Sequence, residues 1–179
     1  MDIKFGKYLA FSRSTRIDTP EIVSLVNKVE TLDGKTLKPM LFHRRVFEHI
    51  LAVVDKGQRG SKLVGAAAIA EPNERYLDFW IPGVEPYVGD QPNIIQVGTA
   101  VMDVDFRGRD WGVAMLDRQI KTIQNYYEAT AVSVVKEEDK SSQAVYEEFG
   151  AVAVARHVMT DRGPVNLFVF NEYRGELAS

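Results

Sequence analysis

Apolar residues along the chain follow two rhythms, one typical of helices and one typical of buried strands. The helical spacing of three and four positions occurs at Ile22, Leu25, Val26 and Val29. Asp18-Thr19-Pro20-Glu21 precedes them and supplies an N-cap candidate, a proline suited to a first turn and an early acidic residue. The pattern predicts a helix here, preceded by a strand at 8–12 and followed by a second helical stretch at 37–47.

Continuous apolar runs predict the strands. In the first half of the chain they cover 50–54 and 63–70, and the polar segment 56–60, which contains two glycines, is typical of a hairpin turn. Further strands are predicted at 94–106, 131–135, 152–159 and 165–170. The last two flank Thr160-Asp161-Arg162-Gly163-Pro164, whose residue types favour a tight connection, so they form a second hairpin.

Residues 71–93 interrupt this rhythm. The segment contains four prolines and four aromatic residues: Pro72, Pro82, Pro86, Pro92, Tyr76, Phe79, Trp80 and Tyr87. Prolines remove backbone donors and disfavour regular structure, while the aromatics make the segment too apolar for a disordered linker. We expect an irregular insert that packs on the body of the protein.

Two helices are predicted in the second half of the chain. One is amphipathic, because apolar residues recur at helical spacing at Val113, Leu116, Ile120, Ile123 and Tyr127. The other should run from about 140 to 149, where Gly150 suits its left-handed C-cap. Together with the strands, these helices indicate an α/β or α+β domain with a mixed sheet.

Composition limits the classes of function. The 179 residues, 45% hydrophobic and 26% charged, suit a single soluble domain over 1–179. A net charge of −3 gives no basic face, so we expect no nucleic-acid partner. Without a signal peptide or an apolar run of about 20 residues, we expect no membrane partner and a cytoplasmic location. A homodimer stays open.

The chain contains no cysteine, so disulfides, thiolate metal sites and an acetyl-cysteine intermediate are excluded. The three histidines, His43, His49 and His157, have no regular spacing and indicate no metal site. His43 and His49 flank two arginines on or just after the second predicted helix, and we expect both at the surface.

The octapeptide Arg107-Gly108-Arg109-Asp110-Trp111-Gly112-Val113-Ala114 joins a predicted strand to a predicted helix. Backbone N–H groups in the first turn of a helix have no intrahelical partner and carry partial positive charge, so this turn favours an anionic phosphate. Its glycines permit close approach and its guanidiniums can pair with phosphate oxygens. An ordinary turn with solvated arginines is the alternative.

Arg109-x-x-Gly112-x-Ala114 resembles motif A of the GNAT superfamily of acyl-CoA-dependent N-acetyltransferases, usually written Gln/Arg-x-x-Gly-x-Gly/Ala. The stretch from Asp139 to Ala151 resembles the family's motif B, Asn-x-x-Ala/Ser-x-x-x-Tyr-x-x-x-Gly-Phe, with its spacing kept. The sequence departs from the family at four positions, where Asp110 replaces the usual Gly, Trp111 an Ile or Val, Asp139 the Asn and Ala151 the Phe. A carboxylate at 110 would repel a pyrophosphate if it faced one.

The resemblance implies a GNAT-like α/β (α+β) fold with a mixed, mostly antiparallel central sheet flanked by helices and split around the cofactor. It implies a V-shaped opening, where the strand ending near 102 parts from the strand at 131–135, and pantetheine bound there along the backbone of Val101, Met102 and Asp103. The turn from Arg107 to Ala114 would hold the pyrophosphate. Asp139 is the remaining residue expected at the cofactor, and no metal is needed.

The motif B tyrosine of the family lies near the CoA sulfur, so the resemblance assigns Tyr146 the role of general acid. A buried packing role is the alternative for this side chain. The general base is left open between Asp103, at the end of the predicted strand, and Glu71, on the expected acceptor side; Asp78 and His157 are further candidates.

The sequence thus predicts an enzyme, an N-acetyltransferase that moves an acetyl group from acetyl-CoA, its cosubstrate, to an amine acceptor by direct attack. The acceptor is either a small molecule or a protein amine. One alternative is a catalytically weak or inactive GNAT-like module that binds CoA or a partner. A small α/β nucleotide-phosphate binder is a second alternative, although the Gly-x-Gly-x-x-Gly and lysine-bearing phosphate loops are missing.

Overall fold

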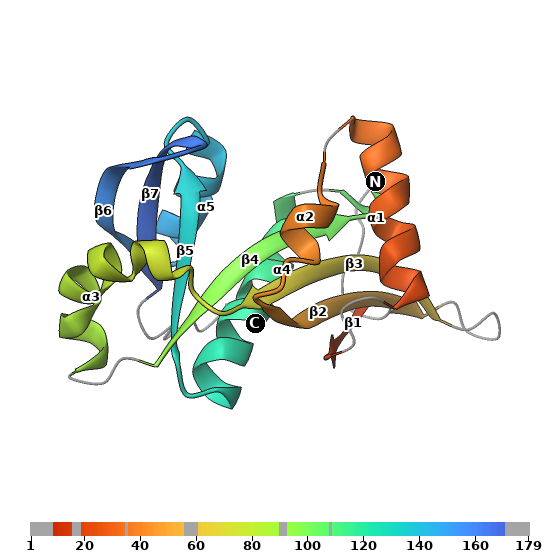
Figure 1. The fold of residues 1–179 in the computed structure, drawn as a ribbon. Coiled ribbons are helices and arrows are strands. Elements are labelled where there is room, and N and C mark those ends of the chain that lie inside the picture. The colour runs from red at the N-terminus through yellow and green to blue at the C-terminus, as the bar shows by residue number, and fades with distance from the viewer. Residues whose placement is uncertain are drawn as a thin grey trace. The chain divides into compact units, whose positions relative to one another are not determined.

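The computed structural model of the chain describes residues 9–15, 19–34, 36–55, 61–89, 93–107 and 109–170. The elements follow one another along the chain in this order (Figure 1): β1 Leu9–Ser14, α1 Pro20–Asp33, α2 Lys38–Leu41, β2 Val46–Asp55, β3 Ser61–Ala70, α3 Glu74–Val88, β4 Ile94–Met102, a 3₁₀ turn Val104–Phe106, α4 Arg109–Lys121, a π turn Thr122–Tyr126, β5 Thr130–Lys136, α5 Lys140–Glu148, β6 Ala151–Thr160 and β7 Gly163–Phe170.

The strands form one seven-stranded sheet in the order β1-β2-β3-β4-β5-β7-β6. Pairing is antiparallel in β1–β2, β2–β3, β5–β7 and β6–β7, and parallel in β4–β5. The predicted fold class, a mixed and mostly antiparallel sheet flanked by helices, is confirmed. The chain divides into two compact units, one formed by 1–70 with 98–119 and the other by 71–97 with 120–179.

In the first unit α1 packs beside the β2–β3 hairpin (Figure 1). The predicted apolar face of α1 is confirmed, because Ile22, Leu25, Val26 and Val29 are all buried. They meet alternate positions of β3, occupied by Ala66, Ala68 and Ala70, whose small side chains let the helix approach the sheet closely. Thr19 takes the N-cap position of α1 and Pro20 its first turn. Residue 18 lies outside the described residues.

The second predicted helix is largely wrong. Only Lys38–Leu41 is helical, and β2 begins at Val46, which pairs with Ala70 of β3. Pairing with a complete neighbouring strand therefore overrides the helical spacing of this stretch. The predicted surface position of His49 is wrong for the same reason, because its side chain points from β2 into the core and is 0% exposed. The turn at 56–60 and residue 8 lie outside the described residues.

The irregular insert predicted at 71–93 is also wrong, because Glu74–Val88 forms the helix α3. Asn73 caps it by accepting a hydrogen bond from the N–H of Arg75 at 3.1 Å. Pro82 and Pro86 are four positions apart and both exposed, so the carbonyls that they leave without a helical partner face water. Trp80 and Val84 are fully buried against the inner positions of β5 and β7.

A close approach to β6 fixes α3 in the second unit. A Cβ added at Gly83 would lie 2.5 Å from Cβ of Val154, so only glycine fits at this contact.

The remaining elements of this unit follow the prediction closely. The π turn extends α4 over part of the predicted amphipathic helix, and Gly150, two positions after the last residue of α5, adopts φ +74°. The strand predicted at 94–106 is shorter, since β4 ends at Met102.

Candidate functional site

The candidate phosphate-binding turn lies at the start of α4, which begins at Arg109. Asp110 and Gly112 are exposed there, and a Cβ added at Gly112 would meet no atom within 4 Å. Trp111 is buried, with its ring edge-on to Phe106 at 5.6 Å between centroids. The first turn therefore presents Asp110 and Gly112 to solvent, at the helix end where an anion site forms. Gly108 and the side chain of Arg109 lie outside the described residues.

Asp103 follows β4 and is held inside the first unit, with its side chain only 2% exposed. Its carboxylate accepts from Lys28 Nζ at 2.7 Å and from Lys62 Nζ at 3.0 Å. Burial by itself would raise the pKa of Asp103, but the hydrogen bonds from both lysines outweigh it and hold the pKa at about 2. A carboxylate that binds protons this weakly is a poor general base.

The backbone beside Asp103 is partly occupied as well. Its N–H donates to the carbonyl of Val64 in β3 at 2.7 Å, so this donor is already used within the sheet. The side chain of Val101 is buried in the core with α1, whereas Met102 lies against Gly65, 2.9 Å from where a Cβ would be. Of the backbone donors expected to bind pantetheine, that of Asp103 is thus engaged.

Arg107 is also engaged. Its two terminal nitrogens donate to the two carboxylate oxygens of Asp33, at 2.8 and 2.6 Å, and its Nε donates to the carbonyl of Met102 at 3.3 Å. The hydrogen bond to Asp33 is the main cause of the raised pKa of Arg107. The guanidinium therefore serves a contact within the protein, where the sequence suggested a phosphate ligand.

Tyr146 lies in the second unit, on α5. Its hydroxyl is 3.1 Å from Oγ of Ser133, which in turn donates to the carbonyl of Val97 at 3.3 Å, so the tyrosine is the donor to the serine. The rings of Phe168 and Phe170 pack edge-on against it. Burial raises the pKa of Tyr146 above its ordinary value of 10.0, so the hydroxyl keeps its proton at neutral pH.

Buried amides hold α5 in place, and sequence reasoning missed them. Gln143 donates to the carbonyls of Lys136 and Glu137 at 3.1 and 2.8 Å, and accepts from Asn166 at 3.1 Å. Gln143 and Asn166 are 5% and 2% exposed. At the start of the helix, the carboxylate of Asp139 accepts from the N–H and hydroxyl of Ser142. Asp139 is thus an N-cap, and α5 presents Tyr146 from a fixed position.

The other candidate bases differ in their surroundings. Glu71 follows β3 and Asp78 lies on α3, and both side chains are exposed. His157 has φ +53°, and its Nδ1 lies 2.7 Å from a carboxylate oxygen of Glu137. The described residues thus leave Glu71 and Asp78 accessible, whereas the ring of His157 is held by a neighbour.

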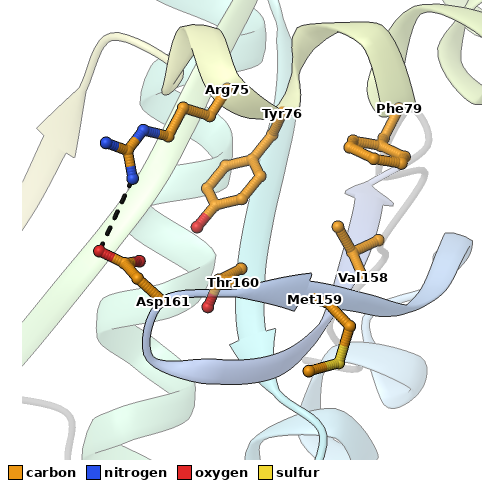
Figure 2. Close-up of a pocket in the computed structure, with 7 residues that line it drawn as sticks. All are labelled: Arg75, Tyr76, Phe79, Val158, Met159, Thr160 and Asp161. Carbon is orange, nitrogen blue, oxygen red and sulfur yellow. Dashed lines mark ion pairs between the residues drawn. The ribbon is translucent and has the colours of Figure 1, made fainter.

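A hollow of about 340 Å³ lies within the second unit, between α3 and the end of β6. Figure 2 shows Arg75, Tyr76 and Phe79 of α3 facing the stretch from Val158 to Asp161. Arg75 and Asp161 form an ion pair of 3.7 Å across one end, and their side chains are 74% and 72% exposed. An exposed pair at this distance is weak. The hydroxyl of Thr160 already donates to the carbonyl of Gly163, so the hollow offers mainly apolar contacts.

Within the described ranges, no helix is long and apolar enough to cross a membrane. The same residues contain no group of three or more histidine, aspartate or glutamate side chains arranged to hold a metal ion.

Comparison with known proteins identifies the fold. No protein-family model and no curated protein sequence matches this chain. Among solved structures, the chain is similar to NAA60 of Arabidopsis thaliana in complex with acetyl-CoA, with 14% identity, a TM-score of 0.65 and coverage of 91% of this chain and 99% of that one.

Two bacterial structures show the same likeness. A GNAT family acetyltransferase from Elizabethkingia anophelis with acetyl-CoA bound has 11% identity and a TM-score of 0.60, over 91% of this chain and 97% of its own. An acyl-CoA N-acyltransferase from Pseudomonas aeruginosa has 13% identity and a TM-score of 0.59, over 90% and 98%. These likenesses extend over nearly the whole length of each protein. The chain therefore has the fold of the GNAT N-acetyltransferases.

Proposed function

We propose that this protein is an N-acetyltransferase that transfers the acetyl group of acetyl-CoA directly to an amine. The observation that carries the proposal is the hydroxyl of Tyr146, protonated at neutral pH and presented by an anchored helix at the motif B position. Two of the similar solved structures contain acetyl-CoA, which supports the same cosubstrate here.

In the proposed reaction the neutral amine attacks the carbonyl carbon of the thioester. A C–N bond forms, the C–S bond breaks, and the leaving thiolate takes the proton of Tyr146. The phenolate then recovers a proton from water. The sequence contains no cysteine, so no acetyl-cysteine precedes this step and the transfer is direct.

Ser133 supports the proposed acid. Because it donates to the carbonyl of Val97, its oxygen accepts the hydroxyl proton of Tyr146 in the resting arrangement. The tyrosine must turn this hydrogen from Ser133 to the thiolate during the reaction. Ser133 therefore orients the phenol without holding its hydrogen too tightly for transfer to the thiolate, since a neutral hydrogen bond contributes only about 1 kcal/mol.

For the cosubstrate, we propose that the pyrophosphate binds the backbone N–H groups in the first turn of α4, where Gly112 is exposed. Arg109 remains the proposed side-chain ligand. The exposed carboxylate of Asp110 opposes this binding by repulsion if it faces the phosphates. Its replacement by glycine should then strengthen acetyl-CoA binding at low salt, more than at high salt.

The proton of the attacking amine needs an acceptor. Asp103 is unsuited, because its pKa of about 2 and its two lysine partners make it a weak base. We propose Glu71, which is accessible and able to act directly or through a water molecule. This assignment predicts that Glu71→Gln slows turnover and leaves acetyl-CoA affinity unchanged.

One alternative function has a specific observation in its favour. Asp103 and Arg107 are both engaged with other side chains, and Asp110 brings a carboxylate to the cofactor turn. A protein that binds CoA weakly and does not turn it over would show the same features.

The proposal is tested by titrating the protein with acetyl-CoA in a calorimeter and by measuring CoA release with a thiol reagent over a panel of amines. Because the protein has no cysteine, the reagent reports only the CoA thiol. We expect saturable binding and release that depends on an amine. Binding without release on any amine would favour the non-catalytic module, and absence of binding would overturn both readings.

A further inference from the structure

We infer that Lys28 and Asp33 of α1 are positioning residues for the candidate phosphate-binding turn at the start of α4. They act through Asp103 and Arg107, which precede that turn in the chain. We call the five residues Lys28, Asp33, Lys62, Asp103 and Arg107 the ionic clamp. The inference rests on the proposed function for its effect on acetyl-CoA, whereas the contacts of the clamp stand by themselves.

The clamp fastens both ends of one short turn to one helix. At its start, Asp103 accepts from Lys28, and at its end Arg107 donates to Asp33. Between these residues lies the 3₁₀ turn of 104–106, after which the chain leads into α4. A turn held at both ends delivers the first residues of α4 to a fixed place.

Asp103 is the fixed point of the clamp. Lys62 of β3 donates to the second carboxylate oxygen of Asp103 at 3.0 Å. The backbone N–H of Asp103 donates to the carbonyl of Val64, and its Oδ1 also accepts from the N–H of Asp105 at 3.3 Å. With the side chain 2% exposed, solvent screens these interactions little. The start of the turn is therefore tied to α1 and to β3 at once.

Asp33 is unfavourable for the stability of α1 by itself, and its contact with Arg107 in the clamp offsets this. It is the last residue of α1, and a carboxylate at a helix C-terminus is repelled by the negative end of the helix dipole. The two short bonds from Arg107 offset this repulsion. The side chains of Asp33 and Arg107 are 19% and 40% exposed, so the pair is shielded from solvent mainly on the side of the carboxylate.

The geometry also decides between two roles for Arg107. With Asp33 on its terminal nitrogens and the Met102 carbonyl on Nε, each of these nitrogens is used by a contact within the protein. If Arg107 is instead a phosphate ligand, Asp33 competes with the phosphate for it. The two roles predict opposite effects of removing Asp33.

The test uses Asp33→Asn, Arg107→Gln and the double variant, with Glu85→Gln as a control that removes one exposed carboxylate from α3. Acetyl-CoA affinity is measured by calorimetry, and KM and kcat with an acceptor from the amine panel. We expect each single variant to raise Kd and KM for acetyl-CoA about threefold to tenfold with kcat unchanged, and the double variant to be no worse than either. The control should match the wild type.

Tighter acetyl-CoA binding by Asp33→Asn would overturn the inference, because it would show that Asp33 competes for a phosphate ligand. A fall in kcat at unchanged KM would overturn it too, since that pattern reflects loss of folded protein. If the wild type binds no acetyl-CoA, the proposed function fails, and the clamp is decided by unfolding free energies alone. Equal losses in the single and double variants then support the clamp, and additive losses contradict it.

Discussion

On folding, the carboxylate of Asp103 leaves water and binds the ammonium groups of Lys28 and Lys62. The free energy of unfolding therefore depends on pH. The pKa of this carboxylate is about 2 in the folded protein, against an ordinary value of 3.8. The folded state therefore binds this proton more weakly than the unfolded state. The stabilisation is complete above about pH 5 and is lost as the pH falls from about 4 to 2. A shift of this size corresponds to about 2 kcal/mol.

We therefore predict that Asp103→Asn lowers the free energy of unfolding by more at pH 7 than at pH 3, by about 1 kcal/mol. Urea unfolding of both proteins at both pH values measures the difference. Asp105→Asn is the control, because the carboxylate of Asp105 is 70% exposed and its contact with Lys28 is long, at 3.5 Å. The same destabilisation at both pH values would contradict the account of Asp103.

Tyr146→Phe keeps the ring between Phe168 and Phe170 and removes only the donor. If the tyrosine is the general acid, kcat should fall about 100-fold or more, while acetyl-CoA affinity changes little. Ser133→Ala, which loses the orienting partner but keeps the phenol, should lower kcat by a smaller factor. Steady-state kinetics measures both, and unchanged kcat in Tyr146→Phe would return the residue to a packing role.

Gly112 separates stability from binding. Its Cβ position is open, so Gly112→Leu brings its Cβ into free space and gains helix propensity, about 0.5 kcal/mol of added stability. The same side chain would stand where the pyrophosphate is proposed to bind. Thermal unfolding should show a stable variant, and calorimetry at least a tenfold weaker Kd for acetyl-CoA. Unchanged affinity would show that the phosphates bind elsewhere.

At the scale of elements, α3 depends on one close contact with β6. Gly83→Ala would place a methyl group 2.5 Å from Cβ of Val154, and either the helix or the strand must then move. We predict a loss of about 1–3 kcal/mol in the free energy of unfolding. Gly112→Ala is the matched control, because the same change there meets nothing. Equal stability of the two variants would mean that α3 shifts without cost.

The elements that local pattern predicts well are those that bury a single regular face. The apolar spacing of α1 and the apolar runs of β3, β5 and β7 are decided by their own residues. The helix α3 is different, since Pro82 and Pro86 argue against it locally. It forms because Trp80 and Val84 are buried by strands far away in the sequence, and because both prolines face water. Likewise Val46 joins β2 only because β3 offers a partner.

The candidate site also has parts that the local sequence predicts and parts that it does not. The turn at the start of α4 and the position of Tyr146 on α5 follow from local motifs, so they could be predicted. The side chains that contact the site residues could not be predicted from the sequence. Asp33 and Arg107 are separated by 74 positions and Gln143 and Asn166 by 23, and no spacing in one sequence shows that such residues meet. The weak basicity of Asp103 follows only from lysines at 28 and 62.

At the scale of the whole molecule, the chain passes between its two units after residues 70, 97 and 119, so that β4 and α4 each contribute to both. The first unit carries the proposed phosphate-binding turn and the ionic clamp. The second carries Tyr146 and the amides that anchor α5. Single-residue variants of these residues therefore report on each unit separately.

The attachment of α1 to the turn has a reciprocal consequence. If α1 favours the binding-competent form of the turn, then a ligand on the turn must stabilise α1 by the same coupling free energy. Amide hydrogens near the end of α1, from Val29 to Asp33, should exchange more slowly with solvent deuterium when acetyl-CoA is present. In Arg107→Gln this protection should weaken even at saturating acetyl-CoA, because α1 would then hold the turn through Lys28 and Asp103 but no longer through Asp33.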